Sequence, residues 1–383
     1  MLSAFLDAKP LYYDKIDYTR MPRVYARIKE SFELPKIIHI IGTNGKGTTG
    51  RFLASALHSI GYSVGHYTSP HIMEFNERIW HNRQNVSMDV LEETHQKLLS
   101  ILREKEAEAL SYFEYTTLLA MLYFSKRCDY VVLEAGLGGE YDATAVFENI
   151  LTLVTPIDKD HEAFLGESVS DIAKTKLNAI QKCAILAKQP YAKEVNEVLR
   201  EIQKQKKIRA YSYEELLDIE DITKIEDIAK QEKLASYLVQ NLALAVAGLR
   251  YLKVEYRAEN FYNARLFGRL SVLEKNILVD VGHNELAARS IVASLKDKKY
   301  ILVYNSYEDK NYEAILSILK PIISSVELID VYNVRVAKSG FLQKTLENLG
   351  IKYSRFKEIE RDRDYLVFGS FSVVEAFMKV YRG

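Results

Sequence analysis

Short apolar runs alternate along the chain with longer segments in which apolar residues recur at helical spacing. The apolar runs predict buried strands at 36–41, 63–67, 130–134, 150–155 and 184–187, and a second series at 277–281, 300–304, 326–331 and 365–368. The helical spacing predicts helices at 51–60, 89–106, 115–126, 191–206 and 235–251, and then at 285–296, 312–319, 341–349 and 372–381. Strands that alternate with helices are typical of an α/β fold with a mainly parallel sheet.

The segment 256–269 carries no clear period and separates the two strand–helix series. We therefore predict a hinge near Leu266–Gly268, between a first domain over 1–265 and a smaller second domain over 269–383. The first should be a P-loop-type domain with a mainly parallel sheet, and the second a Rossmann-like α/β domain. The acidic run 214–227 is predicted to be a surface insertion, and Gly61 to cap the C-terminus of a helix.

Composition and charge exclude several classes of protein. Fifty-two basic residues balance fifty-two acidic ones in a chain of 383, which gives no electrostatic reason to expect nucleic acid or an anionic membrane as partner. The two cysteines, Cys128 and Cys183, lack the spacing of a disulfide framework or a zinc site. No apolar stretch reaches the ~18 residues of a membrane span, and the first residues do not resemble a signal peptide. We therefore expect a cytoplasmic protein.

A glycine-rich loop, GTNGKGT, joins the strand predicted at 36–41 to the helix that follows it. Glycines let backbone N–H groups turn toward a ligand, the helix N-terminus adds positive potential, and the lysine supplies a cation for phosphate oxygens. The spacing differs from GxxxxGK[ST], because a glycine stands between the lysine and the threonine. The loop nevertheless predicts nucleotide binding by Thr43, Asn44, Gly45, Lys46, Gly47 and Thr48.

Glu134 ends the predicted strand 130–134, where its carboxylate would lie at the carboxyl edge of a parallel sheet. Open α/β sheets bind ligands at that edge, and a carboxylate facing a phosphate loop is a suitable ligand for Mg²⁺. An ordinary acidic residue at a strand end remains the alternative.

Nine segments together resemble the dihydrofolate synthase / folylpolyglutamate synthase family, ATP-dependent amide ligases related to the Mur ligases. The segments, in order, are GTNGKGTTG, HYTSPHIMEFNERI, YFEYTT, VVLEAGLGGEYDAT, TPIDKDHEAFLG, QNLALA, VDVGHN, EDKN and GSFSVVEAF. They span nearly the whole chain.

The resemblance implies two Mg²⁺ ions, held by Ser69, Glu134, His161 and Lys176. The lysine at the position of Lys176 is commonly carbamylated in the family, which turns a cation into an oxygen ligand. A lysine needs a lowered pKa for this reaction, because only the neutral amine attacks CO₂. The usual EKAGI around it reads TKLNAI here. An exposed helix lysine is the alternative.

The resemblance also implies ATP contacts by Asn241 on the base side, Arg269 on the phosphates and Asp280 on the ribose. Lys46, Lys176, His161 and Arg269 are then the predicted catalytic residues. The usual PGR before the second domain reads FGR, and the usual proline after HN is Glu285. His283 is predicted to orient nucleotide or substrate.

The substrates implied by the resemblance are ATP, L-glutamate and either dihydropteroate or a reduced folate. The residues assigned to the pterin-bearing acceptor are Asp17, Tyr18, Thr19, Ser111, Tyr112, Phe113, Glu114, Tyr141, Asp142 and Ala143. Aromatic faces can stack on a pterin and carboxylates can accept its protons, although Tyr112 and Phe113 also suit the start of a core helix. The SYFE string is more similar to members that accept dihydropteroate.

The expected activity is therefore ATP-dependent ligation of glutamate to dihydropteroate and to reduced folates, through an acyl phosphate. The resemblance favours a monomer. One alternative is a Mur ligase acting on a cell-wall precursor, although we expect no UDP-binding domain before Gly42. A nucleotide-binding regulatory module is another alternative, and it would need neither the Lys176 carbamate nor a pterin pocket.

Overall fold

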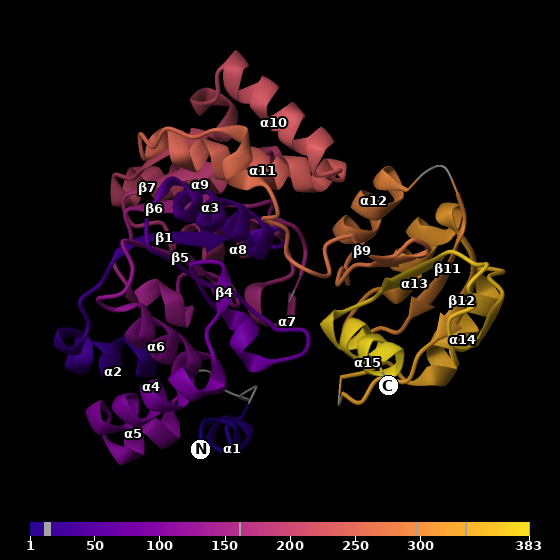
Figure 1. The fold of residues 1–383 in the computed structure, drawn as a ribbon, viewed down its shortest axis with the longest axis horizontal. Coiled ribbons are helices and arrows are strands. Elements are labelled where there is room, and N and C mark those ends of the chain that lie inside the picture. Colours follow the sequence, from indigo (N-terminus) through magenta and orange to yellow (C-terminus); the bar gives the residue numbers. More distant parts are fainter. Residues whose placement is uncertain (11–16, 161, 296–297, 334, 383) are drawn as a thin grey trace. The chain divides into compact units, whose positions relative to one another are not determined.

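The computed structural model describes residues 1–10, 17–160, 162–295, 298–333 and 335–382. The chain separates into two compact units, one of Met1–Leu234 with Leu238–Ala264 and one of Ala235–Tyr237 with Arg265–Gly383 (Figure 1). Each unit contains a mainly parallel sheet flanked by helices, which confirms the predicted α/β class.

In the first unit, the described strands form an eight-stranded sheet in the order β4-β3-β2-β5-β1-β6-β7-β8. From β2 to β8 neighbouring strands run parallel, whereas β3 and β4 are antiparallel additions at one edge. The bounds are β1 (Lys36–Ile41), β2 (Val64–Tyr67), β3 (Ile79–His81), β4 (Gln84–Asn85), β5 (Tyr130–Glu134), β6 (Leu151–Val154), β7 (Cys183–Leu186) and β8 (Arg209–Ser212).

Helices cover both faces of this sheet. Residues of α3, α10 and α11 join one core cluster, while α1, α2, α4, α6, α8 and α9 supply the clusters of the opposite face. Figure 1 shows α10 and α11 on one side of β1 and β5, and α4 and α6 on the other. The bounds are α1 (Leu2–Asp7), α2 (Arg20–Ile28), α3 (Lys46–Ile60), α4 (Met88–Ile101), α5 (Glu104–Ala109), α6 (Tyr112–Phe124), α7 (Glu162–Leu165), α8 (Val169–Leu177), α9 (Ala192–Lys206), α10 (Ile219–Gln231) and α11 (Ser236–Tyr251).

Strand β1 is buried on both faces, which explains its almost continuous apolar sequence. Ile38 and Ile40 pack toward α3 and α11, while Ile37 packs into the opposite face. Because β1 lies between β5 and β6, its carboxyl end lies centrally at the sheet edge. The helix after it, α3, ends at Gly61 with φ +119°, which confirms the predicted C-cap glycine.

In the second unit, the described strands form a six-stranded sheet in the order β13-β12-β11-β14-β10-β9, with only β9 antiparallel to its neighbour. Residues of α12, α13 and α14 share one core cluster with the sheet. The bounds are β9 (Ser271–Glu274), β10 (Ile277–Val279), β11 (Tyr300–Tyr304), β12 (Ile323–Leu328), β13 (Tyr353–Arg355) and β14 (Tyr365–Phe368), with α12 (Glu285–Ser294), α13 (Tyr312–Leu319), α14 (Ser339–Asn348) and α15 (Phe371–Arg382).

Two sequence predictions are wrong. The segment 89–106 is not one helix, because Leu102 and Arg103 adopt extended conformations between α4 and α5. The acidic run 214–227 is not a surface insertion, since it contains most of α10, which buries Ile225 and Ile228 in the core. Its apolar residues recur at helical spacing among the acidic ones.

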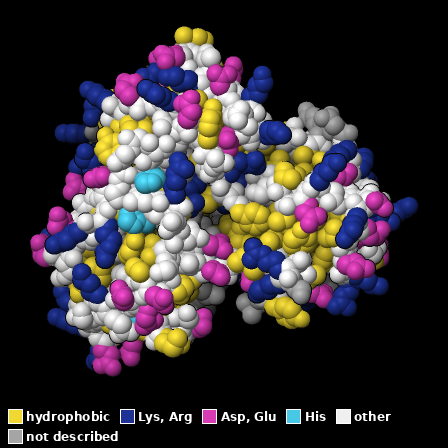
Figure 2. Space-filling view, viewed as in Figure 1, with side chains coloured by type: hydrophobic (Ala, Val, Ile, Leu, Met, Phe, Trp, Pro, Cys, Tyr) yellow, Lys and Arg dark blue, Asp and Glu magenta, His cyan; other side chains and the backbone are white. Residues whose placement is uncertain are grey.

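The surface and the helices add two observations. On the face drawn in Figure 2, Lys and Arg side chains are interspersed with Asp and Glu. Among the described helices, none combines the length and the apolar character needed to cross a membrane.

Candidate functional site

The glycine-rich loop connects the carboxyl end of β1 to the first turn of α3, as predicted. Gly42 and Gly45 have φ values of +136° and +91°, a region that side chains other than glycine rarely adopt. A methyl group at position 42 would lie 2.1 Å from Thr155 Oγ1, and one at position 45 would lie 2.3 Å from Asn241 Oδ1. These two positions therefore require glycine for conformation and for space.

The start of α3 is suited to an anion. Gly45 is the N-cap and has no side chain to satisfy the first N–H groups of the helix, and those groups carry the positive end of its dipole. The hydroxyl of Thr48 is buried and has no hydrogen-bond partner among the described residues. A buried hydroxyl without a partner is costly, so this oxygen fits a ligand that is bound here. Thr43 is held by its backbone N–H, which donates to Pro156 O over 2.9 Å.

Two lysines converge on the loop. Lys46 Nζ donates to the carbonyl oxygens of Gly42 and Thr43 over 3.2 Å each, and Lys176 Nζ donates to Gly42 O over 2.9 Å. Lys176 lies on α8 and is only 4% exposed, so the alternative of an exposed helix lysine is wrong. Burial, with Lys46 close by, lowers the pKa of Lys176 to about 7. Much of this amine is therefore neutral near physiological pH.

Glu134 and Ser69 lie together, at the ends of neighbouring strands. Glu134 ends β5, which pairs with β1 on one side and with β2 on the other, and Ser69 follows β2 closely. The buried Glu134 carboxylate accepts hydrogen bonds from the Thr68 hydroxyl and from the Ser69 N–H, the latter over 3.3 Å. Hydroxyl and carboxylate oxygens are ligands that Mg²⁺ prefers.

Among the described residues, no group of three or more His, Cys, Asp or Glu side chains could hold a metal ion. His161, the predicted ligand of a second ion, lies outside the described residues.

Asn241 contacts the phosphate loop. It is buried on α11, and its carboxamide packs against Gly45, at the N-cap of α3. The prediction for Asn241 named the base side of the nucleotide. The observed contact is with the loop that precedes the helix.

The second unit carries the other three residues predicted to contact ligands. The buried Asp280 carboxylate accepts hydrogen bonds from Tyr237 Oη over 2.7 Å, from the Leu270 N–H over 2.8 Å and from the Gly282 N–H over 2.7 Å. Burial raises the pKa of Asp280, although these donors and Arg269 oppose the effect. The Arg269 guanidinium lies 5.2 Å from the centre of the Phe371 ring.

Asp280 can still accept a ribose hydroxyl, because a carboxylate has about four lone-pair sites. His283 follows Asp280 by three residues, and its Nδ1 lies 3.2 Å from Val281 O. The nucleotide roles of Arg269, Asp280 and His283 stay predictions.

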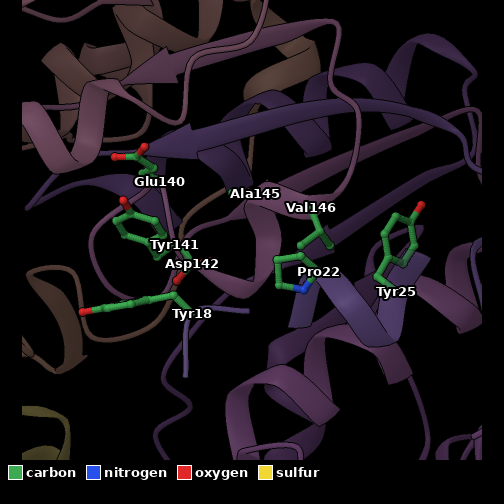
Figure 3. A pocket seen from close by; sticks show the side chains of 8 residues that line it. All are labelled: Tyr18, Pro22, Tyr25, Glu140, Tyr141, Asp142, Ala145 and Val146. Carbon is green, nitrogen blue, oxygen red and sulfur yellow. The ribbon is translucent and has the colours of Figure 1, made fainter. Parts of the chain in front are cut away.

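Several residues predicted for the acceptor line one pocket of ≈ 240 Å³ in the first unit. The rings of Tyr18 and Tyr141 lie with their centroids 4.5 Å apart, and both are substantially exposed. Figure 3 shows the two rings beside each other, with Glu140 next to them. The lining residues are Tyr18, Pro22, Tyr25, Glu140, Tyr141, Asp142, Ala145 and Val146. Aromatic faces with nearby carboxylates suit a flat heterocycle that carries N–H groups.

Asp142 holds the loop that follows β5. Its Oδ2 accepts from the N–H groups of Gly136 and Leu137 over 3.0 and 2.9 Å, and its Oδ1 accepts from the N–H and the hydroxyl of Thr144. The Thr144 hydroxyl in turn lies 2.8 Å from Nε2 of the buried His39. These four bonds occupy the Asp142 side chain, and Ala143 beside it is buried at the start of a short 3₁₀ turn. The acceptor roles of Asp142 and Ala143 stay predictions.

The SYFE segment forms the N-terminus of α6. Ser111 is the N-cap, and Ser111 and Glu114 exchange the two bonds of a capping box. The Phe113 ring packs so closely that a methyl group at Gly136 would lie 2.6 Å from it. Tyr112 lies under the Arg78 guanidinium, 5.2 Å from the ring centre. Phe113 therefore adjoins the loop held by Asp142, and Glu114 serves the helix.

Sequence reasoning missed the side chains that support these groups. Thr68, the partner of Glu134, immediately precedes Ser69 and could have been found by its place after a strand. Arg20, Arg78 and His39 gave no signal, because each depends on contacts with residues distant in sequence.

The chain was compared with family models, with known sequences and with solved structures. No family model matches it. It is 30% identical over 365 residues to the dihydrofolate synthase/folylpolyglutamate synthase of Buchnera aphidicola subsp. Schizaphis graminum, covering 88% of this chain and 86% of the relative. The crystal structure of Helicobacter pylori folylpolyglutamate synthetase matches with 39% identity and a TM-score of 0.80, over 100% of this chain and 98% of that one.

Escherichia coli FolC, solved in complex with DHPP and ADP, matches with 25% identity and a TM-score of 0.81, over 99% of this chain and 96% of that one. Both structural likenesses and the sequence likeness extend over nearly the full length of each relative. The glycine-rich loop, the buried lysine and the strand-end glutamate thus lie in a chain that belongs to the dihydrofolate synthase/folylpolyglutamate synthase family of ATP-dependent ligases.

Proposed function

We propose that this enzyme joins L-glutamate to 7,8-dihydropteroate and, at the same site, to reduced folates. The observation that carries the proposal is the convergence of Lys46, Lys176 and Glu134 at the carboxyl edge of β1 and β5. This edge combines a phosphate-binding helix start, a carboxylate for a cation and a lysine that is partly neutral. An aromatic pocket in the same unit supplies a place for a pterin.

For the nucleotide, we assign the phosphates to the loop from Thr43 to Thr48, with Asn241 supporting the loop. Two features fit this role: the buried Thr48 hydroxyl, and the first turn of α3, whose N–H groups receive no hydrogen bond from a capping side chain. The second unit would contribute Arg269 to the phosphates and Asp280 to the ribose. In this assignment the first domain, 1–265, binds the ATP phosphates and the folate, and the second domain, 269–383, carries Arg269 and Asp280.

Two Mg²⁺ ions fit the donor types present, and they would neutralise charge on the phosphate oxygens. Ser69 and Glu134 would hold the first ion, because Glu134 ends β5 and Ser69 closely follows the adjoining strand β2, with the Ser69 N–H bonded to the Glu134 carboxylate. His161 and a carbamylated Lys176 would hold the second. The lowered pKa of Lys176 supports carbamylation, because a neutral amine is available to attack CO₂.

The proposed reaction has two steps. An acceptor carboxylate oxygen attacks the γ-phosphorus of ATP, ADP leaves, and an acyl phosphate forms. The α-amine of glutamate then attacks the acyl carbon, phosphate leaves from the tetrahedral intermediate, and the amine gives up a proton. Lys46 and Arg269 would stabilise the charge that develops on the transferred phosphoryl group. No protein nucleophile is needed.

The experiment that tests the proposal is product analysis. Purified enzyme is incubated with Mg-ATP, L-glutamate and 7,8-dihydropteroate, and the products are separated and weighed by mass spectrometry. The expected product is dihydropteroate carrying one glutamyl residue, formed in equal amount with ADP. ADP formed without any glutamylated pterin would refute the acceptor assignment. A reaction that occurs without ATP would refute the acyl-phosphate route.

A further inference from the structure

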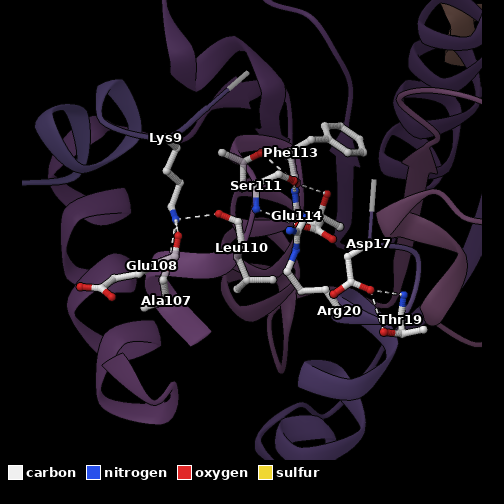
Figure 4. Close-up of polar contacts among 12 residues, drawn as sticks. Lys9, Asp17, Thr19, Arg20, Ala107, Glu108, Leu110, Ser111, Phe113 and Glu114 are labelled. Carbon is white, nitrogen blue, oxygen red and sulfur yellow. Dashed lines mark hydrogen bonds and ion pairs between the residues drawn. The ribbon is translucent and has the colours of Figure 1, made fainter. Parts of the chain in front are cut away.

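One buried ion pair joins two segments that are distant in sequence but are both assigned to the acceptor. Arg20 is the first residue of α2 and directly follows Asp17–Thr19, while Glu114 lies in the first turn of α6. Arg20 Nε and Nη2 each lie 2.8 Å from Glu114 Oε2. Figure 4 shows the Arg20 and Glu114 side chains together. Both residues are buried, at 8% and 9% exposure.

The position of this pair is energetically unfavourable unless both charges are matched. A cation in the first turn of a helix opposes the helix dipole, and a buried charge without its partner is strongly destabilising. Glu114 Oε2 also accepts from the Ser111 N–H over 2.7 Å, and the Ser111 hydroxyl accepts from the Glu114 N–H over 3.1 Å. One carboxylate therefore links the start of α2 to the start of α6.

The α2 side of the pair carries an aromatic ring into the pocket. Asp17 Oδ1 accepts from the N–H and the hydroxyl of Thr19 over 3.0 and 2.7 Å, which forms a tight turn immediately before Arg20. This turn presents Tyr18, whose ring faces Tyr141 in the pocket of Figure 3. A shift of the start of α2 would therefore move Tyr18.

The α6 side carries a second ring. Phe113 directly precedes Glu114, and its ring packs against Gly136 in the loop that Asp142 holds. Tyr141 belongs to the same stretch of chain as Gly136 and Asp142. The ion pair thus connects the turn that carries Tyr18, just before α2, to the first turn of α6, which carries Phe113.

A second contact ties the preceding chain to the same region. Lys9 Nζ donates to Ala107 O over 2.5 Å and to Leu110 O over 2.8 Å, just before Ser111 (Figure 4). Its ammonium group lies 4.6 Å from the centre of the Phe5 ring. The connection between α5 and α6 is therefore held by the segment that follows α1, and the start of α6 is held from α2.

We propose that Arg20 and Glu114 form a positioning pair for the acceptor, fixing Tyr18 against Tyr141 in the pocket and Phe113 against Gly136 in the loop that carries Tyr141, and so the space available to a flat heteroaromatic ring. The inference rests on the proposed function, because it requires that the acceptor binds beside these rings. The pair acts on acceptor binding through Tyr18 and Phe113, and it has no part in nucleotide binding.

The test compares steady-state kinetics of Arg20→Met, Arg20→Lys, Glu114→Gln and the double variant Arg20→Met/Glu114→Gln. The control is Arg27→Met on the same helix, because Arg27 Nε donates over 2.8 Å to Glu106, the capping-box glutamate of α5. Arg20→Met should raise KM for dihydropteroate about tenfold, which corresponds to loss of one buried charge-assisted contact, and leave KM for ATP within about twofold.

The other variants separate positioning from direct contact. Glu114→Gln should raise the same KM, the double variant should be no worse than the more severe single variant, and Arg20→Lys should recover part of the loss. Arg27→Met should change neither KM. Thermal unfolding identifies folded variants, and if Arg20→Met does not fold, Arg20→Lys and Glu114→Gln decide the question by the same KM criteria.

Three results would overturn the proposal. The first is a folded Arg20→Met with an unchanged KM for dihydropteroate, since Glu114 would then either contact the acceptor directly or only cap α6. The second is an equal rise in the KM for ATP, and the third is an equal effect of Arg27→Met. If the unmodified enzyme does not glutamylate dihydropteroate at all, the proposed function fails, and the positioning role fails with it.

Discussion

Replacing Lys176 by methionine should make the protein more stable and inactive. Lys176 is buried at the phosphate loop, where its pKa falls from 10.5 to about 7. At pH 8 the unfolded lysine is charged and the folded amine is mainly neutral. Releasing the proton on folding therefore costs about 3 kcal/mol, at about 1.4 kcal/mol for each pH unit below 10.5. The hydrogen bond to Gly42 O returns about 1 kcal/mol. Methionine fills similar space without a charge, so the free energy of unfolding of Lys176→Met should be about 2 kcal/mol higher than that of the unmodified enzyme.

The lowered pKa of Lys176 also predicts how the free energy of unfolding changes with pH. Between pH 7 and pH 10.5 the unfolded chain binds one more proton at Lys176 than the folded chain, so the free energy of unfolding should rise with pH in that window. Lys176→Met should lack this rise. The assay is urea unfolding at several pH values in buffer freed of CO₂. Parallel pH slopes, or a methionine variant that is less stable at pH 8, would refute the reasoning.

Carbamylation is tested with the same two proteins. Adding bicarbonate should stabilise the unmodified enzyme, because the carbamate forms on the folded chain, and it should not affect Lys176→Met. Turnover should be lost in Lys176→Met at every bicarbonate concentration. An active Lys176→Met would end the carbamate proposal.

Three further predictions concern the loop, the metal and the fold. Gly45→Ala should raise KM for ATP at least about tenfold, because Gly45 has a φ of +91° and the added methyl group would meet Asn241. The control is Gly340→Ala, whose methyl group would meet nothing within 4 Å, and this variant should behave as the unmodified enzyme. Glu134→Gln should abolish ATP turnover, and near-normal rates at saturating Mg²⁺ would remove Glu134 from the metal site. Asp221→Ala should lower the free energy of unfolding by about 3 kcal/mol, because it leaves Arg250 and Tyr256 without their shared carboxylate; a loss under about 1 kcal/mol would contradict this.

Sequence patterns predicted the parts of the fold that depend on local order. β1, β5, β11 and β14 lie at the predicted residues, because buried parallel strands read as short continuous apolar runs. The phosphate loop was also predictable, since glycine and lysine in a strand-to-helix turn have a direct physical meaning. In contrast, β3 and β4 are too short to show a period, and their antiparallel pairing depends on contacts across the sheet.

The supporting contacts of the site could not be predicted from the sequence. Arg20 and Glu114 are separated by 94 positions, and Lys176 and Gly42 by 134. Neither pairing follows from propensity or from motif spacing. The burial that lowers the pKa of Lys176 likewise arises only when α8 packs beside the loop. Glu114 and Lys176 were therefore predictable as site residues, whereas Arg20, the partners of these residues and the protonation state of Lys176 were not.

The measurement that tests the central claim most directly is ADP release by the purified enzyme with Mg-ATP and L-glutamate, comparing 7,8-dihydropteroate with tetrahydrofolate as acceptor. The account predicts that both acceptors stimulate ADP release, and that each stimulation requires glutamate. Release with tetrahydrofolate alone would contradict the dihydropteroate assignment and the role given to the SYFE segment. If neither acceptor stimulates release, the assignment of the acceptor site is wrong.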